Sequence, residues 1–109
     1  MKVSFYVYGR VQAVMFRKTF CYGAIARKLE AGATNDRSNK ERVLCSVAGD
    51  RDNIELFLDE LQSLATLNSW GASVTNIEML DVFTEVSRHE ITTLNVDHKP
   101  RTQDIEFFL

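Results

Sequence analysis

The stretch Gly9-Arg10-Val11-Gln12-Ala13-Val14-Met15-Phe16-Arg17 lies where the hydrophobic period of the chain changes. Before it, residues 3–8 alternate between aliphatic side chains and polar or aromatic ones, which predicts a β-strand. After it, the spacing predicts an α-helix from Phe16 to about Leu29. The stretch is therefore expected to be a strand-to-helix turn that ends in an arginine.

A turn of this kind is suited to binding an anion. Backbone N–H groups that converge at a helix N-terminus form a cavity for phosphate, and the Arg17 guanidinium would add a planar, bidentate partner. Seventeen residues lie between Arg17 and Asn35, enough for one helix and a return strand. The Asn35 amide offers an uncharged donor and acceptor. The two residues together suggest an enzyme that acts on a small phosphorylated substrate.

The rest of the chain alternates between strand and helix patterns. Polar residues 36–40 separate two strand-like runs, which indicates a hairpin, and the repeat that follows Asp52 is the clearest helical period in the chain, with Asp52 as the expected cap. Residues 85–104 are polar and are expected to form a surface excursion with a brief strand at 91–96. The other expected elements are strands at 31–36, 42–49 and 74–83, a helix from 52 to about 65, and a terminal strand through Ile105, Phe107 and Leu109.

The order β-α-β-β-α-β with an added terminal strand is the ferredoxin-like arrangement. In this α+β fold, a mainly antiparallel sheet carries both helices on one face. A length of 109 residues and an apolar content of 45% fit one domain over residues 1–109.

The composition excludes several classes of partner. A net charge of −2 gives no general field for nucleic acid or anionic lipid, so any anion binding must be local. Neither a leader-like segment nor an apolar run of about 20 residues is present, which favours a cytoplasmic protein without a membrane partner. Cys21 and Cys45 are expected to be packed thiols, and His89 and His98 are expected in surface loops without a metal.

Residues 7–17 closely resemble the acylphosphatase signature G-x-V-Q-G-V-x-F-R, with agreement at every fixed position but one. Asn35 matches the second signature of that family, an asparagine at the end of the strand after the first helix. A hairpin, a valine and a glycine follow it, here Val43 and Gly49. The resemblance covers nearly the whole chain.

The resemblance implies an acylphosphatase that needs neither metal nor cofactor. It assigns Arg17 to the phosphoryl group and Asn35 to the attacking water, while the phosphate of the substrate accepts the water proton. An acyl phosphate has a good carboxylate leaving group, so positioning and electrostatic complementarity suffice. The amides implied to bind the phosphoryl oxygens belong to Val11, Gln12, Ala13, Val14, Met15 and Phe16.

The chain departs from the family pattern at three places. Ala13 replaces a glycine, which would cost about 1 kcal/mol if the position needs a positive φ. Ala31 and Gly32 replace a glycine-aromatic pair, and the hairpin after Asn35 is about two residues longer. Asp36 puts a carboxylate next to Asn35, but strand alternation is expected to turn its side chain to the opposite face.

Two other functions remain open. A relative that binds phosphate but hydrolyses acyl phosphates poorly would keep the fold, with Ala13 as the cause of the slow turnover. An RNA-binding domain shares the element order and would stack bases on Tyr6 and Tyr8. The expected enzyme is a monomer whose only partner is a small-molecule acyl phosphate.

Overall fold

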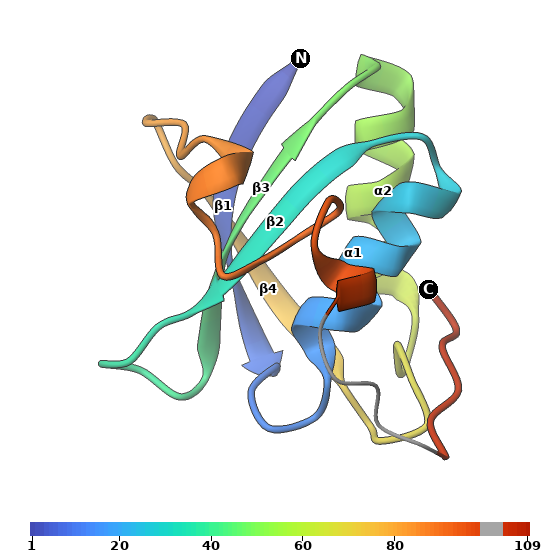
Figure 1. Cartoon of the computed structure of the whole chain (residues 1–109). Helices are drawn as coiled ribbons and strands as arrows, with labels where there is room; N and C mark the ends of the chain where they lie inside the picture. Colours follow the sequence, from blue (N-terminus) through green and yellow to red (C-terminus); the bar gives the residue numbers. More distant parts are fainter. Residues whose placement is uncertain (99–103) are drawn as a thin grey trace.

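The computed structural model describes residues 1–98 and 104–109 (Figure 1). Both helices lie on one face of a five-stranded sheet, which has the order β4-β1-β3-β2-β5 with antiparallel neighbours throughout. The expected ferredoxin-like fold is confirmed. The elements are β1 (Lys2–Arg10), α1 (Phe16–Ala26), β2 (Glu30–Asn35), β3 (Arg42–Ala48), α2 (Arg51–Ser63), β4 (Ser73–Met79), η1 (Val86–Arg88), β5 (Ile91–Thr92) and η2 (Val96–His98).

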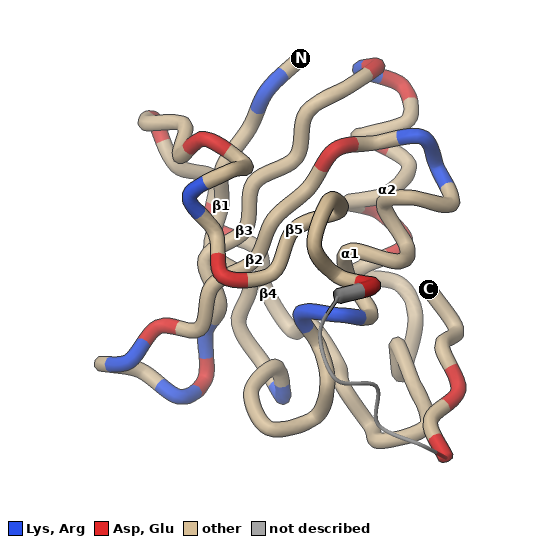
Figure 2. The backbone as a smooth tube through the Cα atoms, viewed as in Figure 1, with Lys and Arg blue, Asp and Glu red and all other residues tan. Residues whose placement is uncertain are grey.

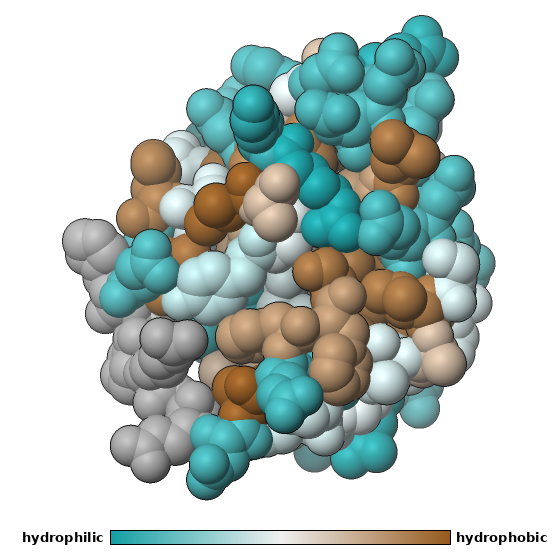
Figure 3. All heavy atoms as spheres, turned by 90° about the vertical axis from the view of Figure 1, so that its right-hand side faces the viewer, coloured by the Kyte–Doolittle hydropathy of each residue, from teal (hydrophilic) through white to brown (hydrophobic). Residues whose placement is uncertain are grey.

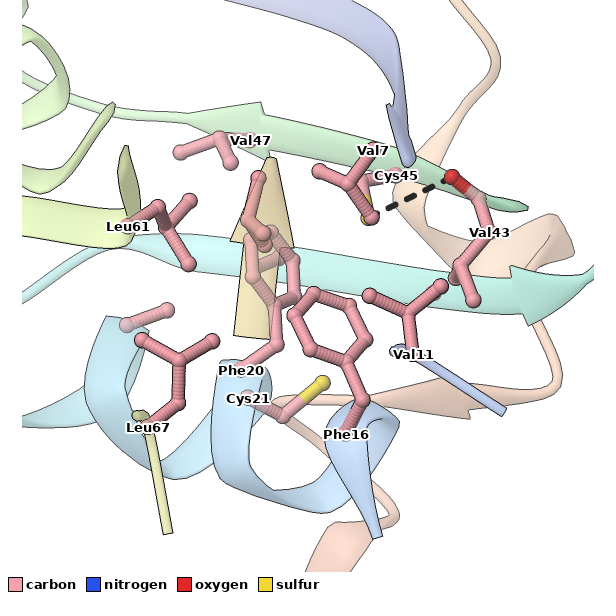
Figure 4. Close-up of a cluster of buried hydrophobic side chains, with 14 of the residues drawn as sticks. Val7, Val11, Phe16, Phe20, Cys21, Val43, Cys45, Val47, Leu61 and Leu67 are labelled. Carbon is pink, nitrogen blue, oxygen red and sulfur yellow. Dashed lines mark hydrogen bonds between the residues drawn. The ribbon is translucent and has the colours of Figure 1, made fainter. Parts of the chain in front are cut away.

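The core is built around an aromatic stack between the sheet and the helices. The Phe20 ring on α1 lies 5.7 Å from Phe16, 5.2 Å from Phe57 on α2 and 6.2 Å from Phe5 on β1, measured between centroids. All four rings are buried. Such pairs contribute about 0.5–1.5 kcal/mol each beyond the burial of their area. Figure 4 shows Phe16 and Phe20 among the valines of the sheet, so the first turn of α1 is held firmly against it.

Both helices end before their hydrophobic stripes do. Lys28 has a φ of 60°, and the Leu29 amide donates to the Ala24 carbonyl at 2.9 Å, which closes α1 in a Schellman motif after Ala26. The second helix begins at Arg51 with Asp50 as its N-cap, so the assignment of the cap to Asp52 is wrong. It ends at Ser63, two residues before the expected end.

The fifth strand is β5 on the free edge of β2, within the expected brief strand at 91–96. The expected terminal strand at 105–109 is wrong, because this segment forms only the isolated bridge between Asn68 and Phe107. Its alternation is nevertheless present, since residues 105, 107 and 109 are half-buried and 104, 106 and 108 are exposed. The apolar side chains of this segment pack on the helices. The ring centroids of Phe107 and Tyr22 are 5.3 Å apart, and Leu109 lies against Gly23.

The C-terminal segment therefore belongs to the helical layer. Figure 3 looks at the side of the molecule where α2 and the C-terminal end lie, and hydrophobic side chains gather in its middle with hydrophilic ones around them. Phe108 and Leu56 are 48% and 60% exposed.

Among the described residues, no helix combines the length and apolar content that a membrane crossing requires.

The segment before β5 covers part of the sheet face opposite the helices. His89, expected in a surface loop, is only 6% exposed. Its Nδ1 lies 2.9 Å from Thr34 Oγ1, and its Nε2 lies 2.7 Å from Ser46 Oγ. A Cβ at Gly32 would lie 2.7 Å from the Cβ of His89, so the missing side chain at Gly32 makes room for the imidazole. Residues 99–103 of the expected excursion, and the His98 side chain, lie outside the described part of the structure.

The buried imidazole predicts a pH-dependent stability. Burial lowers the pKa of His89 below its ordinary value, so the ring is neutral in the folded protein and the unfolded chain takes up the proton first as the pH falls. The contribution of His89 is complete above its ordinary pKa of about 6.5 and is lost below it. We predict that the free energy of unfolding in urea falls between about pH 7.5 and about pH 5.5, and falls less in His89→Gln. Equal slopes in the two proteins would contradict this account.

Candidate active site

The turn between β1 and α1 has the backbone of an anion cradle. Ala13 and Met15 have φ values of 63° and 60°, whereas Val14 between them does not have a positive φ. A turn in which left-handed residues alternate with residues of negative φ can bring successive amides toward one point, as in an anion-binding nest. Ala13 therefore has the positive φ at which alanine, unlike glycine, is strained.

Several amides of this turn have no hydrogen-bond partner among the described residues. No acceptor within residues 1–98 or 104–109 takes a hydrogen bond from the amides of Gln12, Ala13 or Val14. The first turn of α1 contains no acidic residue, and its N-cap Met15 makes no side-chain capping bond. The positive end of the helix dipole thus faces the turn uncompensated. Figure 2 shows basic residues at the start of α1 and an uncharged turn before it.

A cavity of about 210 Å³ opens beside the turn and brings Arg17 and Asn35 together. Of the six turn residues expected around a phosphoryl group, four line it, while Gln12 and Val14 do not. Lys18, Trp70 and Ile91 were not anticipated there, although Lys18 directly follows Arg17 in the sequence. The lining residues are Val11, Ala13, Met15, Phe16, Arg17, Lys18, Asn35, Trp70 and Ile91.

Arg17 projects from the first turn of α1 and is partly exposed. Its Nη1 lies 3.5 Å from Oε1 of Glu90, and the two side chains are 30% and 45% exposed. An ion pair of this exposure contributes about 0–1 kcal/mol, so little free energy holds Arg17 to Glu90. The guanidinium is therefore able to turn toward an anion in the cavity at small cost.

Asn35 ends β2 and has an unsatisfied acceptor. Within the described residues, its Oδ1 is buried and has no hydrogen-bond partner. A buried acceptor without a partner costs about 1–3 kcal/mol, so evolution tolerates one mainly where a ligand or substrate group completes it. Because Asn35 also lines the cavity, rotation of its side chain would let Oδ1 accept a hydrogen bond from a group bound there.

Gln12 ties the cradle to the hairpin that carries Asn35. Its side-chain amide donates to three carbonyls of the hairpin, those of Asp36, Asn39 and Arg42, at 3.0, 3.0 and 2.8 Å. These hydrogen bonds fix the distance between the turn and the end of β2.

Asp36 is engaged away from the cradle, as strand alternation predicts. Hydrogen bonds from Ser38, followed by that from Arg42, lower the pKa of Asp36 to about 2. The Arg42 Nε lies 2.5 Å from Asp36 Oδ2, and its guanidinium lies 4.0 Å from the centre of the Tyr6 ring. The carboxylate next to Asn35 is therefore ionised and paired with its own cation.

The thiol groups are not suited to nucleophilic catalysis. Cys21 and Cys45 are free and buried, as expected. Burial raises the pKa of Cys21 to about 12, against a smaller opposing effect of Arg17. Burial likewise raises the pKa of Cys45 well above its ordinary value. Among residues 1–98 and 104–109, no cluster of three or more His, Cys, Asp or Glu side chains is arranged to hold a metal ion.

Comparison with known proteins matches the chain to a family. The model of the acylphosphatase family matches residues 3–91 of the chain. No curated protein matches the sequence significantly.

Three solved structures resemble the chain. An acylphosphatase from Bacillus subtilis has 24% identity and a TM-score of 0.60, covering 81% of this chain and 91% of its own. An acylphosphatase from Coxiella burnetii has 25% identity and a TM-score of 0.58, covering 79% and 85%. HypF from T. kodakarensis has 27% identity and a TM-score of 0.61 over 78% of this chain, but only 11% of that much longer chain.

The left-handed backbone at Ala13 predicts a stabilising substitution. Ala13→Gly is expected to raise the free energy of unfolding by about 0.5–1 kcal/mol. Relief of about 1–2 kcal/mol of strain outweighs the entropic cost of glycine, about 0.5–1 kcal/mol. Ala26→Gly, the same change at an exposed helical position, is expected to lower it by about 0.5–1 kcal/mol. Urea denaturation measures both, and a loss of stability in Ala13→Gly would refute the strain.

Proposed function

The chain belongs to the acylphosphatase family, and on that premise we propose that it hydrolyses small acyl phosphates to a carboxylate and inorganic phosphate. The observation that carries the proposal is the cavity in which a cradle of amides, a partly free arginine and an unsatisfied asparagine meet. We propose further that the enzyme acts as a cytoplasmic monomer, with the substrate as its only partner.

In the proposed reaction, the cradle and Arg17 hold the phosphoryl oxygens. Amides of residues 11–16 and the helix N-terminus supply fixed dipoles, and the guanidinium supplies a full charge. Both oppose the negative charge on the equatorial oxygens during transfer. Because these donors are held by the fold, they need little reorganisation as the reaction proceeds.

Asn35 would orient the attacking water. Its Oδ1 would accept a hydrogen bond from the water, so that a lone pair of the water oxygen points at phosphorus, in line with the bond to the carboxyl oxygen. The new P–O bond forms as the bond to the carboxyl oxygen breaks, and the carboxylate leaves with the electron pair. One water proton passes to another phosphate oxygen, and the other stays on the oxygen that is now bonded to phosphorus. No step needs a metal or a strong base.

Among the described residues that line the cavity, none is a histidine or a carboxylate. His89 bonds to Thr34 and Ser46 on the opposite face of the sheet, and the pKa of Asp36 is lowered to about 2. Positioning is thus the main contribution that this site can make, and an acyl phosphate is a substrate for which positioning suffices.

Two observations favour a second candidate, a phosphate-binding relative with slow turnover. Ala13 occupies a left-handed position, and Arg17 has Glu90 as a competing partner. Turnover of Ala13→Gly distinguishes the two, because a large rise supports the slow relative and an unchanged rate argues against it.

The RNA-binding alternative is weaker. Arg42 covers the Tyr6 ring, and the Tyr8 hydroxyl donates to Glu78 at 2.6 Å, so both aromatic side chains already have partners. A filter-binding assay with single-stranded RNA tests it directly, and saturable binding would favour this alternative.

The proposal predicts which side chains control turnover. With benzoyl phosphate and a chelator present, Arg17→Ala is expected to lower kcat/KM by at least about a hundredfold, since it removes the cation that binds the phosphoryl group. Asn35→Ala is expected to lower kcat by a similar factor with little change in KM, because it acts on the water.

Arg51→Ala provides the matched control, since the ion pair of this exposed arginine within the described residues is with Glu55 on α2. Its kcat/KM is expected to stay within about twofold of the wild type. Hydrolysis by the wild-type protein that does not exceed that of Arg17→Ala would refute the proposed function.

A further inference from the structure

Asn68 is a fully buried amide beside the cradle, in the segment between α2 and β4. Its Nδ2 donates to the Val14 carbonyl and to Thr19 Oγ1, both at 2.8 Å. Its Oδ1 accepts from the amides of Trp70 at 2.9 Å and Ala72 at 3.2 Å. Every hydrogen-bonding position of the side chain is used, which fixes the orientation of the amide.

We propose that Asn68 is a positioning residue, which holds the peptide unit between Val14 and Met15 in the orientation that anion binding requires. This inference rests on the proposed function and adds a residue that touches neither the substrate nor the water. The bond to the Val14 carbonyl joins Asn68 directly to the cradle, 54 positions away in the sequence.

The planar peptide bond explains how a bond to a carbonyl controls the cradle. In a trans peptide the C=O and the following N–H point in opposite directions. With the Val14 oxygen drawn toward buried Asn68, the far edge of the same peptide unit faces away from the core. A flip of this peptide would turn a carbonyl dipole toward the cradle, where it would repel a phosphoryl oxygen.

Backbone strain favours that flip when the bond is absent. Met15 has a φ of 60°, a conformation that side chains other than glycine rarely adopt. Rotation of the Val14–Met15 peptide by about half a turn changes φ of Met15 by the same amount and returns it to the favoured negative range. The hydrogen bond from Asn68 opposes this relaxation.

Thr19 supports the next peptide unit in the same way. The Met15 carbonyl accepts from the Thr19 amide at 3.1 Å and from Thr19 Oγ1 at 2.7 Å. The hydroxyl that donates to Met15 also receives the second hydrogen of Asn68 Nδ2. Two consecutive carbonyls of the turn are therefore held through one side-chain amide.

The test is the affinity for inorganic phosphate, measured by calorimetric titration of folded protein. Asn68→Ala is expected to weaken binding at least tenfold. Adding Met15→Gly to this variant is expected to recover most of the loss, because glycine has no reason to leave a positive φ. Met15→Gly alone is measured as the reference for the double variant. Recovery by a glycine that forms no new bond is not expected if Asn68 only stabilises the fold.

Two further variants keep the test decisive. Asn68→Ser keeps an oxygen for the Trp70 amide but is too short to reach Val14, so it replaces Asn68→Ala if the latter does not fold. Asn53→Ala removes an amide that donates to the Arg27 carbonyl at the far end of α1, and should not change phosphate affinity.

The outcomes separate the two proposals. A folded Asn68 variant with wild-type affinity, or a loss that Met15→Gly does not recover, would overturn the role of Asn68. A wild-type protein that binds phosphate but hydrolyses no acyl phosphate would overturn the proposed function alone. A wild-type protein that binds no phosphate would overturn both.

Discussion

The stack of Phe16, Phe20 and Phe57 is the interaction on which the site depends. It holds the first residue of α1 in the core, and the end of β1 is held in the sheet by β3 and β4. Only residues 11–15 remain to join these two fixed points. The short connection curls through left-handed positions at Ala13 and Met15, and the curl itself turns the amides inward. Strain in the turn is thus a consequence of packing elsewhere.

The polar contacts around the turn share one consequence, since they keep acceptors out of the cradle. Gln12 engages three hairpin carbonyls, Asn68 engages the Val14 carbonyl, and Arg42 holds the Asp36 carboxylate on the outer face. The described residues that line the cavity include two cations, Arg17 and Lys18, and no carboxylate, while Asn35 contributes a side-chain amide. This imbalance favours an anion accompanied by one water molecule.

The parts predicted correctly from the sequence depend on local patterns. The turn at 9–17 and the helix after Asp52 can each be predicted from residues that are close in the sequence. The number of residues between Arg17 and Asn35 likewise corresponds to one helix and one strand. The structural roles of Asn68 and His89 could not be predicted, because their partners are distant in the sequence. Asn68 lies 54 positions from Val14. His89 lies 43 positions from Ser46 and 55 from Thr34. The terminal alternation was real, but period two shows only that one side is buried, and here the helices, not a strand, bury it.

A crystal structure of the protein with inorganic phosphate tests the central claim most directly. The account predicts one phosphate ion in the cavity, bound by amides of residues 11–16 and by Arg17 turned away from Glu90. A water molecule should lie between the ion and Asn35 Oδ1. An empty cradle at saturating phosphate, or an ion bound only in the second cavity beside Arg10 and Lys40, would contradict it.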